Sequence, residues 1–173
     1  MRMPGECAGL AGCLLTAALL GVSSTPARAG DACTGTYMTT QMKQIPLPVT
    51  VSLSSDPENP ALAGRFLEGM RAAGGQIDAA SPLKITLVFT LTTAGGAQVF
   101  NNFSWGQQGG APVNLQSGSI ELTAQVMDTN TYAYVWAASA SCRIKVPDAG
   151  PVAYELGRLI GRTLGRDVQN GTL

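Results

Sequence analysis

The side chains that could carry chemistry in this chain are few, and their spacing suits little catalysis. None of the 173 residues is a histidine, which removes His-based acid–base chemistry, His-dependent triads and His metal ligands. No nucleophile–base pair, phosphate-binding loop or metal-ligand cluster is recognisable, so we predict no catalytic residue, no metal and no cofactor. If two carboxylates met in one pocket, a carboxylate-based hydrolase would be the enzymatic alternative. The acids beyond residue 29 are scattered, at Asp31, Asp56, Glu58, Glu68, Asp78, Glu121, Asp128, Asp148, Glu155 and Asp167.

The N-terminal segment has the pattern of a cleaved secretory signal. A weakly basic start at Arg2 precedes an apolar run over 10–22, and an A-x-A site over 27–29 precedes Gly30. The apolar run is too short for a transmembrane anchor, which needs about 20 apolar residues. We predict cleavage of residues 1–29 and a periplasmic or secreted product. Lipidation at Cys13, within a Leu-Ala-Gly-Cys sequence, is the alternative.

The cysteines then reduce to one pair. Cleavage removes Cys7 and Cys13 and leaves Cys33 and Cys142. An exported chain with two cysteines, no CxxC motif and no histidine favours a disulfide over a reactive thiol or a metal site. We therefore predict a Cys33–Cys142 disulfide.

A long segment over 93–118 is rich in Gly, Asn and Gln and contains three aromatic residues. A connection of this length within a compact domain is usually functional or mobile. Aromatic rings beside amides suit stacking on sugars or contact with a peptide. The alternative is an additional strand over 99–103 whose aromatics cover the core. The candidate ligand-binding loop comprises Phe100, Asn101, Asn102, Phe103 and Trp105.

Hydrophobic periodicity predicts one α+β domain over 47–168. Strands with one apolar face are expected over 47–55, 83–92 and, as a hairpin, 117–144, with amphipathic helices over 60–73 and 151–166. We predict two layers, with both helices on one face of a mixed, mostly antiparallel sheet of about four strands. Residues 30–46 are expected as an irregular lead-in and 169–173 as a tail.

The central hairpin turns at Asp128-Thr129-Asn130-Thr131, because Asp and Asn favour turns. With Thr129 and Asn130 at the centre, Val126 would lie opposite Ala133. Tyr132, Tyr134 and Trp136 would then lie on the outer face. The predicted core face comprises Ile120, Leu122, Ala124, Val126, Ala133, Val135 and Ala137.

The helix over 151–166 places Gly157, Gly161 and Gly165 four residues apart. Each interior glycine costs about 1 kcal/mol relative to Ala, which favours a close backbone contact as their reason. We predict tight packing of this helix on the sheet. The alternative is a homodimer through helix 151–166.

The hairpin resembles a motif of exported bacterial envelope proteins. In the pattern D-x-x-T-G…V-W, Asp128, Thr131 and Trp136 match, whereas Tyr132 stands where the family has Gly in a bulge. The family includes the N-terminal domain of the Tol-system translocation protein and the curli-secretion lipoprotein. The resemblance covers about residues 47–166, with specific matches only in the hairpin. It implies a small β-α-β-β-β-α domain and an envelope role through protein partners.

Charge and composition narrow the partner classes. The chain has 11 basic and 11 acidic side chains, so no electrostatic feature favours nucleic acid. We predict a non-enzymatic accessory domain that binds a protein partner in the cell envelope, with no transmembrane span after signal cleavage. A glycan- or peptide-binding module that uses the 93–118 loop is the alternative.

Overall fold

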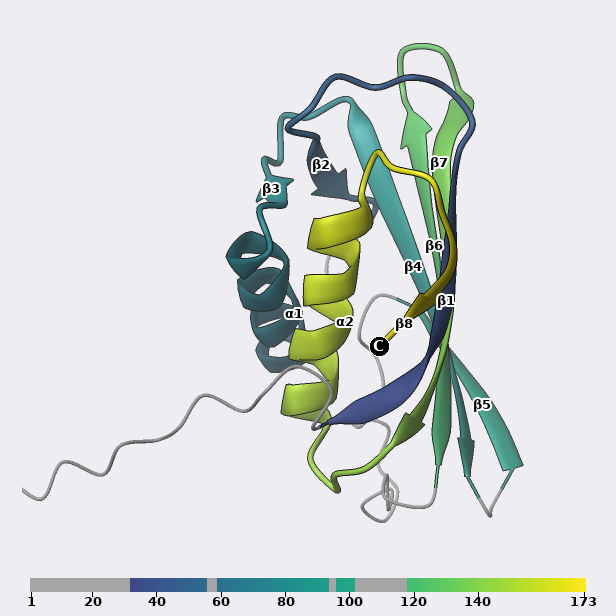
Figure 1. Cartoon of the computed structure of the whole chain (residues 1–173). Coiled ribbons are helices and arrows are strands. Elements are labelled where there is room, and N and C mark those ends of the chain that lie inside the picture. Colours follow the sequence, from purple (N-terminus) through teal and green to yellow (C-terminus); the bar gives the residue numbers. More distant parts are fainter. Residues whose placement is uncertain (1–31, 56–58, 94–95, 102–117) are drawn as a thin grey trace, which may run out of the picture.

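The computed structural model describes residues 32–55, 59–93, 96–101 and 118–173, so the predicted signal segment lies outside the described residues. The described chain forms two helices and eight strands (Figure 1). In chain order they are β1 (Cys33–Gln41), β2 (Thr50–Leu53), α1 (Pro60–Ala72), β3 (Gln76–Ile77), β4 (Leu83–Thr93), β5 (Gly96–Asn101), β6 (Ser119–Asp128), β7 (Ala133–Ile144), α2 (Ala149–Thr163) and β8 (Val168–Thr172).

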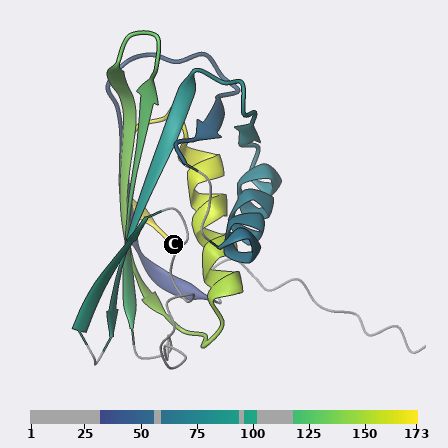
Figure 2. The same cartoon turned by 180° about the vertical axis from the view of Figure 1, so that it is seen from behind.

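The strands form one mixed sheet, and both helices lie on the same face of it (Figure 2). The strand order is β3-β2-β4-β6-β7-β1-β8, with β5 paired to β4. The pairing is parallel where β2 joins β3 and β4, and antiparallel elsewhere. The two-layer α+β arrangement with helices on one face is confirmed. The prediction of about four strands was wrong, because the strands with few aliphatic residues give little periodic signal.

Strand β1 occupies most of the segment predicted as an irregular lead-in. It pairs antiparallel with β7 along its whole length, from Cys33 opposite Ile144 to Gln41 opposite Trp136. Its side chains alternate between more buried and exposed positions, but Thr, Gly and Tyr carry much of that alternation. A half-buried strand is usually identified in a sequence by alternating aliphatic residues, and β1 has few of them. Its assignment as a strand therefore rests on its pairing with β7.

The predicted C-terminal tail is also a strand. β8 lies on the far edge of β1. The N–H of Leu173 donates to the carbonyl of Gly35 at 3.0 Å, and the carboxylate of Asp167 accepts from the N–H of Gln41. The residues of β8 show no apolar periodicity, and they form a strand because they pair with the outer edge of β1.

Two predicted elements were too long. The strand expected from Leu47 begins at Thr50, so Leu47 is 57% exposed, whereas Val49 and Val51 are buried as predicted. The C-terminal helix begins at Ala149 and ends at Thr163 instead of 166. The first helix agrees with its prediction, and the side chain of Asn59 caps its N-terminus.

The β6–β7 hairpin is confirmed, but its predicted register was wrong. Val126 lies opposite Trp136 rather than Ala133. The register shifts between Val126 and Met127, which leaves Val135 as the extra residue of a β-bulge. Val135 and Trp136 are consequently both buried, and the Trp136 indole is in the core rather than on the outer face.

The turn of this hairpin is held by its aspartate. The Asp128 carboxylate accepts hydrogen bonds from the Asn130 N–H at 2.9 Å and from the Thr131 hydroxyl at 3.0 Å. The Asn130 N–H chiefly lowers the pKa of the Asp128 carboxyl below its ordinary value, and the Thr131 hydroxyl adds to this. Tyr132, in the place of the family glycine, has φ of 54° and is 81% exposed. The backbone thus keeps a conformation that glycine adopts freely.

Helices α1 and α2 pack against each other through glycine. A Cβ at Gly157 would lie 2.0 Å from the carbonyl oxygen of Phe66, and one at Gly161 would lie 2.3 Å from that of Met70. The prediction that these glycines pack on the sheet was therefore wrong, since α1 lies against them. Gly165 lies beyond the helix. A homodimer through this helix stays a prediction and would need a different face.

The disulfide between Cys33 and Cys142 is present, with a Cα–Cα distance of 5.7 Å and both residues 1% exposed. It joins β1 to β7 across 109 residues of sequence. The two cysteines are diagonal neighbours, because Cys142 lies opposite Gly35.

We expect Gly157→Ala to lower the free energy of unfolding by about 3 kcal/mol or more, because its Cβ would meet the α1 backbone. Gly64→Ala is the matched control. Gly64 is in α1 with nothing within 4 Å of an added Cβ, so Ala should stabilise by about 0.5–1 kcal/mol. Urea unfolding measures both, and equal effects would contradict the helix contact.

We expect Tyr132→Gly to raise the free energy of unfolding by about 0.5–1 kcal/mol. Relief of the left-handed backbone outweighs the added chain entropy of glycine. Tyr132→Ala removes the ring but keeps the Cβ, and it should give no gain. A similar gain in both variants would assign the effect to the ring instead.

We expect Cys33→Ser to lower the free energy of unfolding by about 2–4 kcal/mol, because the long loop in the unfolded chain becomes free. Denaturant unfolding of the variant and of the oxidised protein gives the difference. Peptide mapping without reductant should recover the linked Cys33 and Cys142 peptides, and two free thiols in protein isolated from its native compartment would contradict the bond.

Candidate functional site

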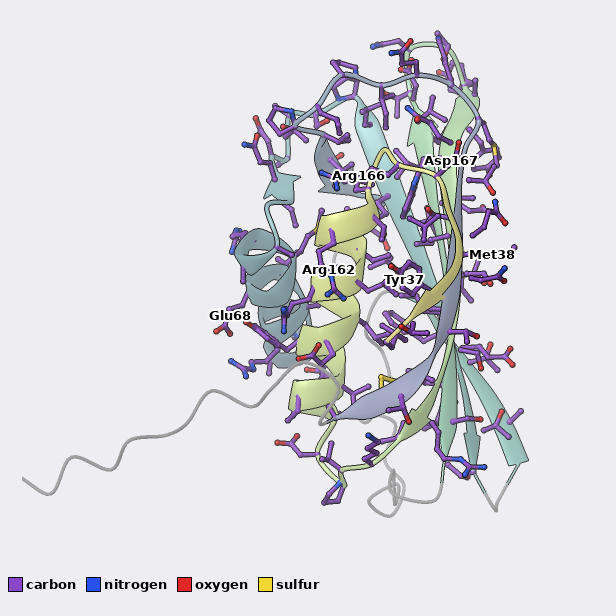
Figure 3. All side chains as sticks on the ribbon, viewed as in Figure 1. Tyr37, Met38, Glu68, Arg162, Arg166 and Asp167 are labelled. Carbon is purple, nitrogen blue, oxygen red and sulfur yellow. A yellow bond between two sulfur atoms is a disulfide. The ribbon has the colours of Figure 1, made fainter. Side chains whose placement is uncertain are left out.

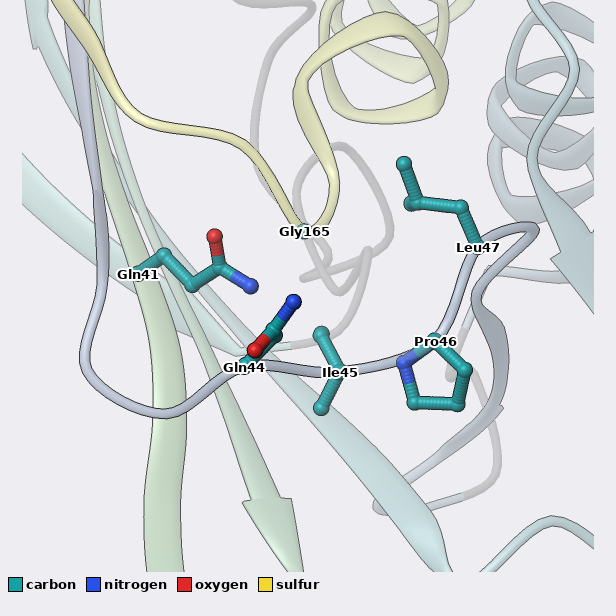
Figure 4. Close-up of a pocket in the computed structure, with 6 residues that line it drawn as sticks. All are labelled: Gln41, Gln44, Ile45, Pro46, Leu47 and Gly165. Atoms are coloured by element: carbon teal, nitrogen blue, oxygen red, sulfur yellow. The ribbon is translucent and has the colours of Figure 1, made fainter.

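A hollow of about 510 Å³ lies between the β1–β2 connection and the end of α2 (Figure 4). The side chains of Gln41 and Gln44 point into it towards Gly165, and Leu47 lies across from them. This volume is in the range of ligand-binding pockets, about 300–1,000 Å³. The residues lining the hollow are Gln41, Gln44, Ile45, Pro46, Leu47 and Gly165.

The wall of the hollow on the α2 side depends on Gly165. Its φ of 73° directs the chain away from the helix, directly after Leu164 donates to the carbonyl of Ile160. A Cβ at Gly165 would lie 2.7 Å from Val49 Cγ2 and 3.1 Å from Leu47 Cδ2. Glycine therefore serves both the backbone turn and the close approach of the β1–β2 connection.

The residues after Gly165 are anchored to the sheet. The carbonyl oxygen of Arg166 accepts from the Thr39 hydroxyl at 2.7 Å and from Trp136 Nε1 at 3.1 Å. The adjacent carboxylate of Asp167 accepts from the Gln41 N–H. Figure 3 shows Arg166 and Asp167 at this end of the molecule. The position of Gly165 relative to β1 is therefore fixed by two partly buried hydrogen bonds and one exposed hydrogen bond.

The lining of the hollow combines amide groups with apolar surface. Each Gln amide both donates and accepts hydrogen bonds, and Ile45, Pro46 and Leu47 offer apolar surface. None of the six lining residues carries a charge, a nucleophile or a titratable group. Such a site matches a neutral ligand with alternating polar and apolar groups, as in an extended peptide.

Several acidic side chains of the described chain accept hydrogen bonds from backbone N–H groups or lie beside a cation. Three of them accept from the N–H two residues later: Asp78 from Ala80, Asp128 from Asn130 and Asp148 from Gly150. Glu155 lies 3.5 Å from the guanidinium of Arg158. Among residues 32–55, 59–93, 96–101 and 118–173, no three His, Cys, Asp or Glu side chains come together as metal ligands.

The predicted aromatic and amide loop is described only in part. Phe100 and Asn101 end β5, where the backbone of Phe100 lies opposite Phe89 and that of Asn101 opposite Val88. This agrees with part of the alternative strand over 99–103. Asn102, Phe103 and Trp105 lie outside the described residues, so ligand binding by this loop stays a prediction.

Sequence reasoning missed the hollow, because its residues fall in the supposed lead-in and before the expected strand. One signal was present in the chain. Leu47 lies between two prolines, within a connection that also contains Ile45 and Val49. Within the described part of the chain, no helix is long and apolar enough to cross a membrane.

Comparisons with known proteins show likeness of fold only. No family model matches the chain, and no curated protein matches it. A PDZ domain protein from Parabacteroides distasonis is similar with a TM-score of 0.50 and 11% identity, over 80% of this chain and 37% of that one. PelC of Paraburkholderia phytofirmans, solved as a dodecamer, has a TM-score of 0.44 and 12% identity, over 78% of this chain and all of that one. A single-site variant of the same PelC, also solved as a dodecamer, has a TM-score of 0.43 and 13% identity, over 74% of this chain and 96% of that one.

Proposed function

We propose that the protein is an exported, non-enzymatic accessory domain that binds a protein partner in the cell envelope. The observation that carries this proposal is the hollow, whose lining combines two amides with apolar side chains and contains no acid, base or nucleophile. The Cys33–Cys142 bond supports an oxidising compartment, either the periplasm or the exterior.

A neutral, extended segment of the partner suits the hollow better than a sugar. Sugar rings are commonly held against the face of an aromatic side chain, and the lining has no aromatic residue. A peptide backbone can exchange paired hydrogen bonds with the amides of Gln41 and Gln44. One apolar side chain of the segment would then contact Ile45 and Leu47.

The test uses a photo-crosslinking amino acid at Leu47 in cells that export the protein. Leu47 is 57% exposed, so this change should not disturb folding. We expect one discrete protein adduct from Leu47 and none from the control position Thr123, which is exposed on the opposite face of the sheet. Equal adducts from both positions, or none from Leu47, would contradict the proposal.

A charged residue introduced into the hollow tests the proposal independently, through the yield of the crosslinked adduct. With the crosslinker at Gln44, Leu47→Asp should reduce the adduct about tenfold, because a buried unpaired carboxylate costs more than about 1.4 kcal/mol. Thr123→Asp is the matched control and should leave the adduct unchanged.

A further inference from the structure

The outer strands of the described sheet differ in how well they are protected against pairing with another chain. These strands are β8 at one side and β3 and β5 at the other. Exposed strand edges are usually protected by short length, charge, proline or an irregular register. β3 has only two residues. β8 has a register shift where it pairs with Tyr37 and Thr39, and its Asn170 has a φ of 56°. Both edges are therefore poor templates for a further strand.

Strand β5 has none of these protections. It pairs with β4 over six consecutive residues, from Gly96 opposite Thr93 to Asn101 opposite Val88, without a register shift. Its sequence, Gly-Ala-Gln-Val-Phe-Asn, contains no charge and no proline. Among the described residues, no strand pairs with its other edge. β5 is therefore the edge of this sheet that is available for pairing with another strand.

The pairing pattern determines which backbone groups of β5 point outward. The carbonyl of Ile85 accepts from the N–H of Ser54, directly after β2, so odd-numbered β4 residues bond toward the edge that β2 and β5 share. These residues lie opposite even-numbered residues of β5, which therefore bond to β4. The odd-numbered residues of β5 direct their N–H and C=O groups away from β4. These outward residues are Ala97, Val99 and Asn101.

The sequence around β5 carries no charge over a long stretch. No Asp, Glu, Lys or Arg lies between Lys84 and Glu121. Two copies of β5 can therefore approach each other without like charges in opposite positions, which would destabilise the pair. A strand of a different protein is commonly selected by opposite charge, and β5 has no charge to provide that selection. An identical strand needs no such complement.

The position of β5 leaves its outer edge clear of the helix layer. Figures 1 and 2 both show β5 projecting from the end of the sheet opposite the β6–β7 turn and away from α1 and α2. A sheet can therefore continue beyond β5 without meeting the helices. The hollow lies toward the other end of the sheet, since its Gln41 is paired with Trp136 near the β6–β7 turn.

We propose that β5 pairs antiparallel with β5 of a second copy of this chain, across a two-fold axis. The register that bonds the outward groups of both strands pairs Ala97 with Asn101 of the partner subunit and places Val99 on the axis. Because the contact uses the same surface on both copies, it closes at a dimer. This surface is separate from the hollow, so either proposal can fail without the other.

Sedimentation equilibrium tests the dimer, with oxidised protein isolated from its native compartment and measured over a concentration series. Pairing through one short strand buries little surface, so we expect a monomer–dimer equilibrium with a micromolar dissociation constant. Val99→Pro removes an N–H that points away from β4 and should raise that dissociation constant about tenfold or more. Because the bonds between β4 and β5 are kept, the free energy of unfolding of the monomer should change little.

Charge at the axis supplies a second test. Val99→Lys and Val99→Glu should each give a monomer, because like charges would lie opposite each other, and an equimolar mixture of the two variants should recover a dimer. Gln169→Lys, exposed on β8, is the matched control and should leave the dimer unchanged. A wild-type monomer at every concentration, a larger polymer, or a dimer that Val99→Lys and Val99→Pro leave intact would overturn the proposal.

Discussion

Strand β1 is the element on which the rest of this structure depends, and three kinds of bond hold it in place. It pairs with β7 over its full length and is linked to that strand by the Cys33–Cys142 disulfide near one end. Near the other end, the Arg166 carbonyl accepts from both Thr39 and Trp136. The strand itself has few aliphatic residues, so these attachments replace the burial that usually stabilises a strand. Without β1, β8 would lack its pairing edge.

The two helices are held together by close backbone contact at glycines and not by large side chains between them. Gly157 and Gly161 allow the α2 backbone to approach the carbonyl groups of Phe66 and Met70. Each interior glycine lowers helix propensity, and the close approach lets fully buried side chains such as Phe66 and Leu156 fill the space above the sheet. The helix layer is therefore one rigid unit against which β1 and the residues after α2 are positioned.

The hollow arises where this framework ends. Residues 42–49 leave β1 and pass over the end of α2, so this short connection contributes Leu47 to the hollow. The disulfide lies at the other end of β1, away from the hollow. The hollow displays uncharged and apolar groups on a stabilised core. Such a preorganised surface loses little conformational entropy when a partner binds.

The sequence by itself determined the elements that have strong local signals. The Asn59 cap with Pro60 and the apolar stripe around Phe66 predicted α1, the alternation from Leu83 predicted β4, and cysteine counting predicted the disulfide. Their physical basis lies within a few residues of sequence or, for the disulfide, in the single pair of cysteines that the predicted signal cleavage would leave. Tertiary structure alone decided β1, β8 and the hairpin register. The first two are polar segments ordered by an adjoining strand edge, and the bulge at Val135 is favoured because it buries Trp136, whose indole N–H then reaches the Arg166 carbonyl. The hollow needed the tertiary structure for the same reason, because its residues, from Gln41 to Gly165, meet only after the segment that follows α2 has packed on β1.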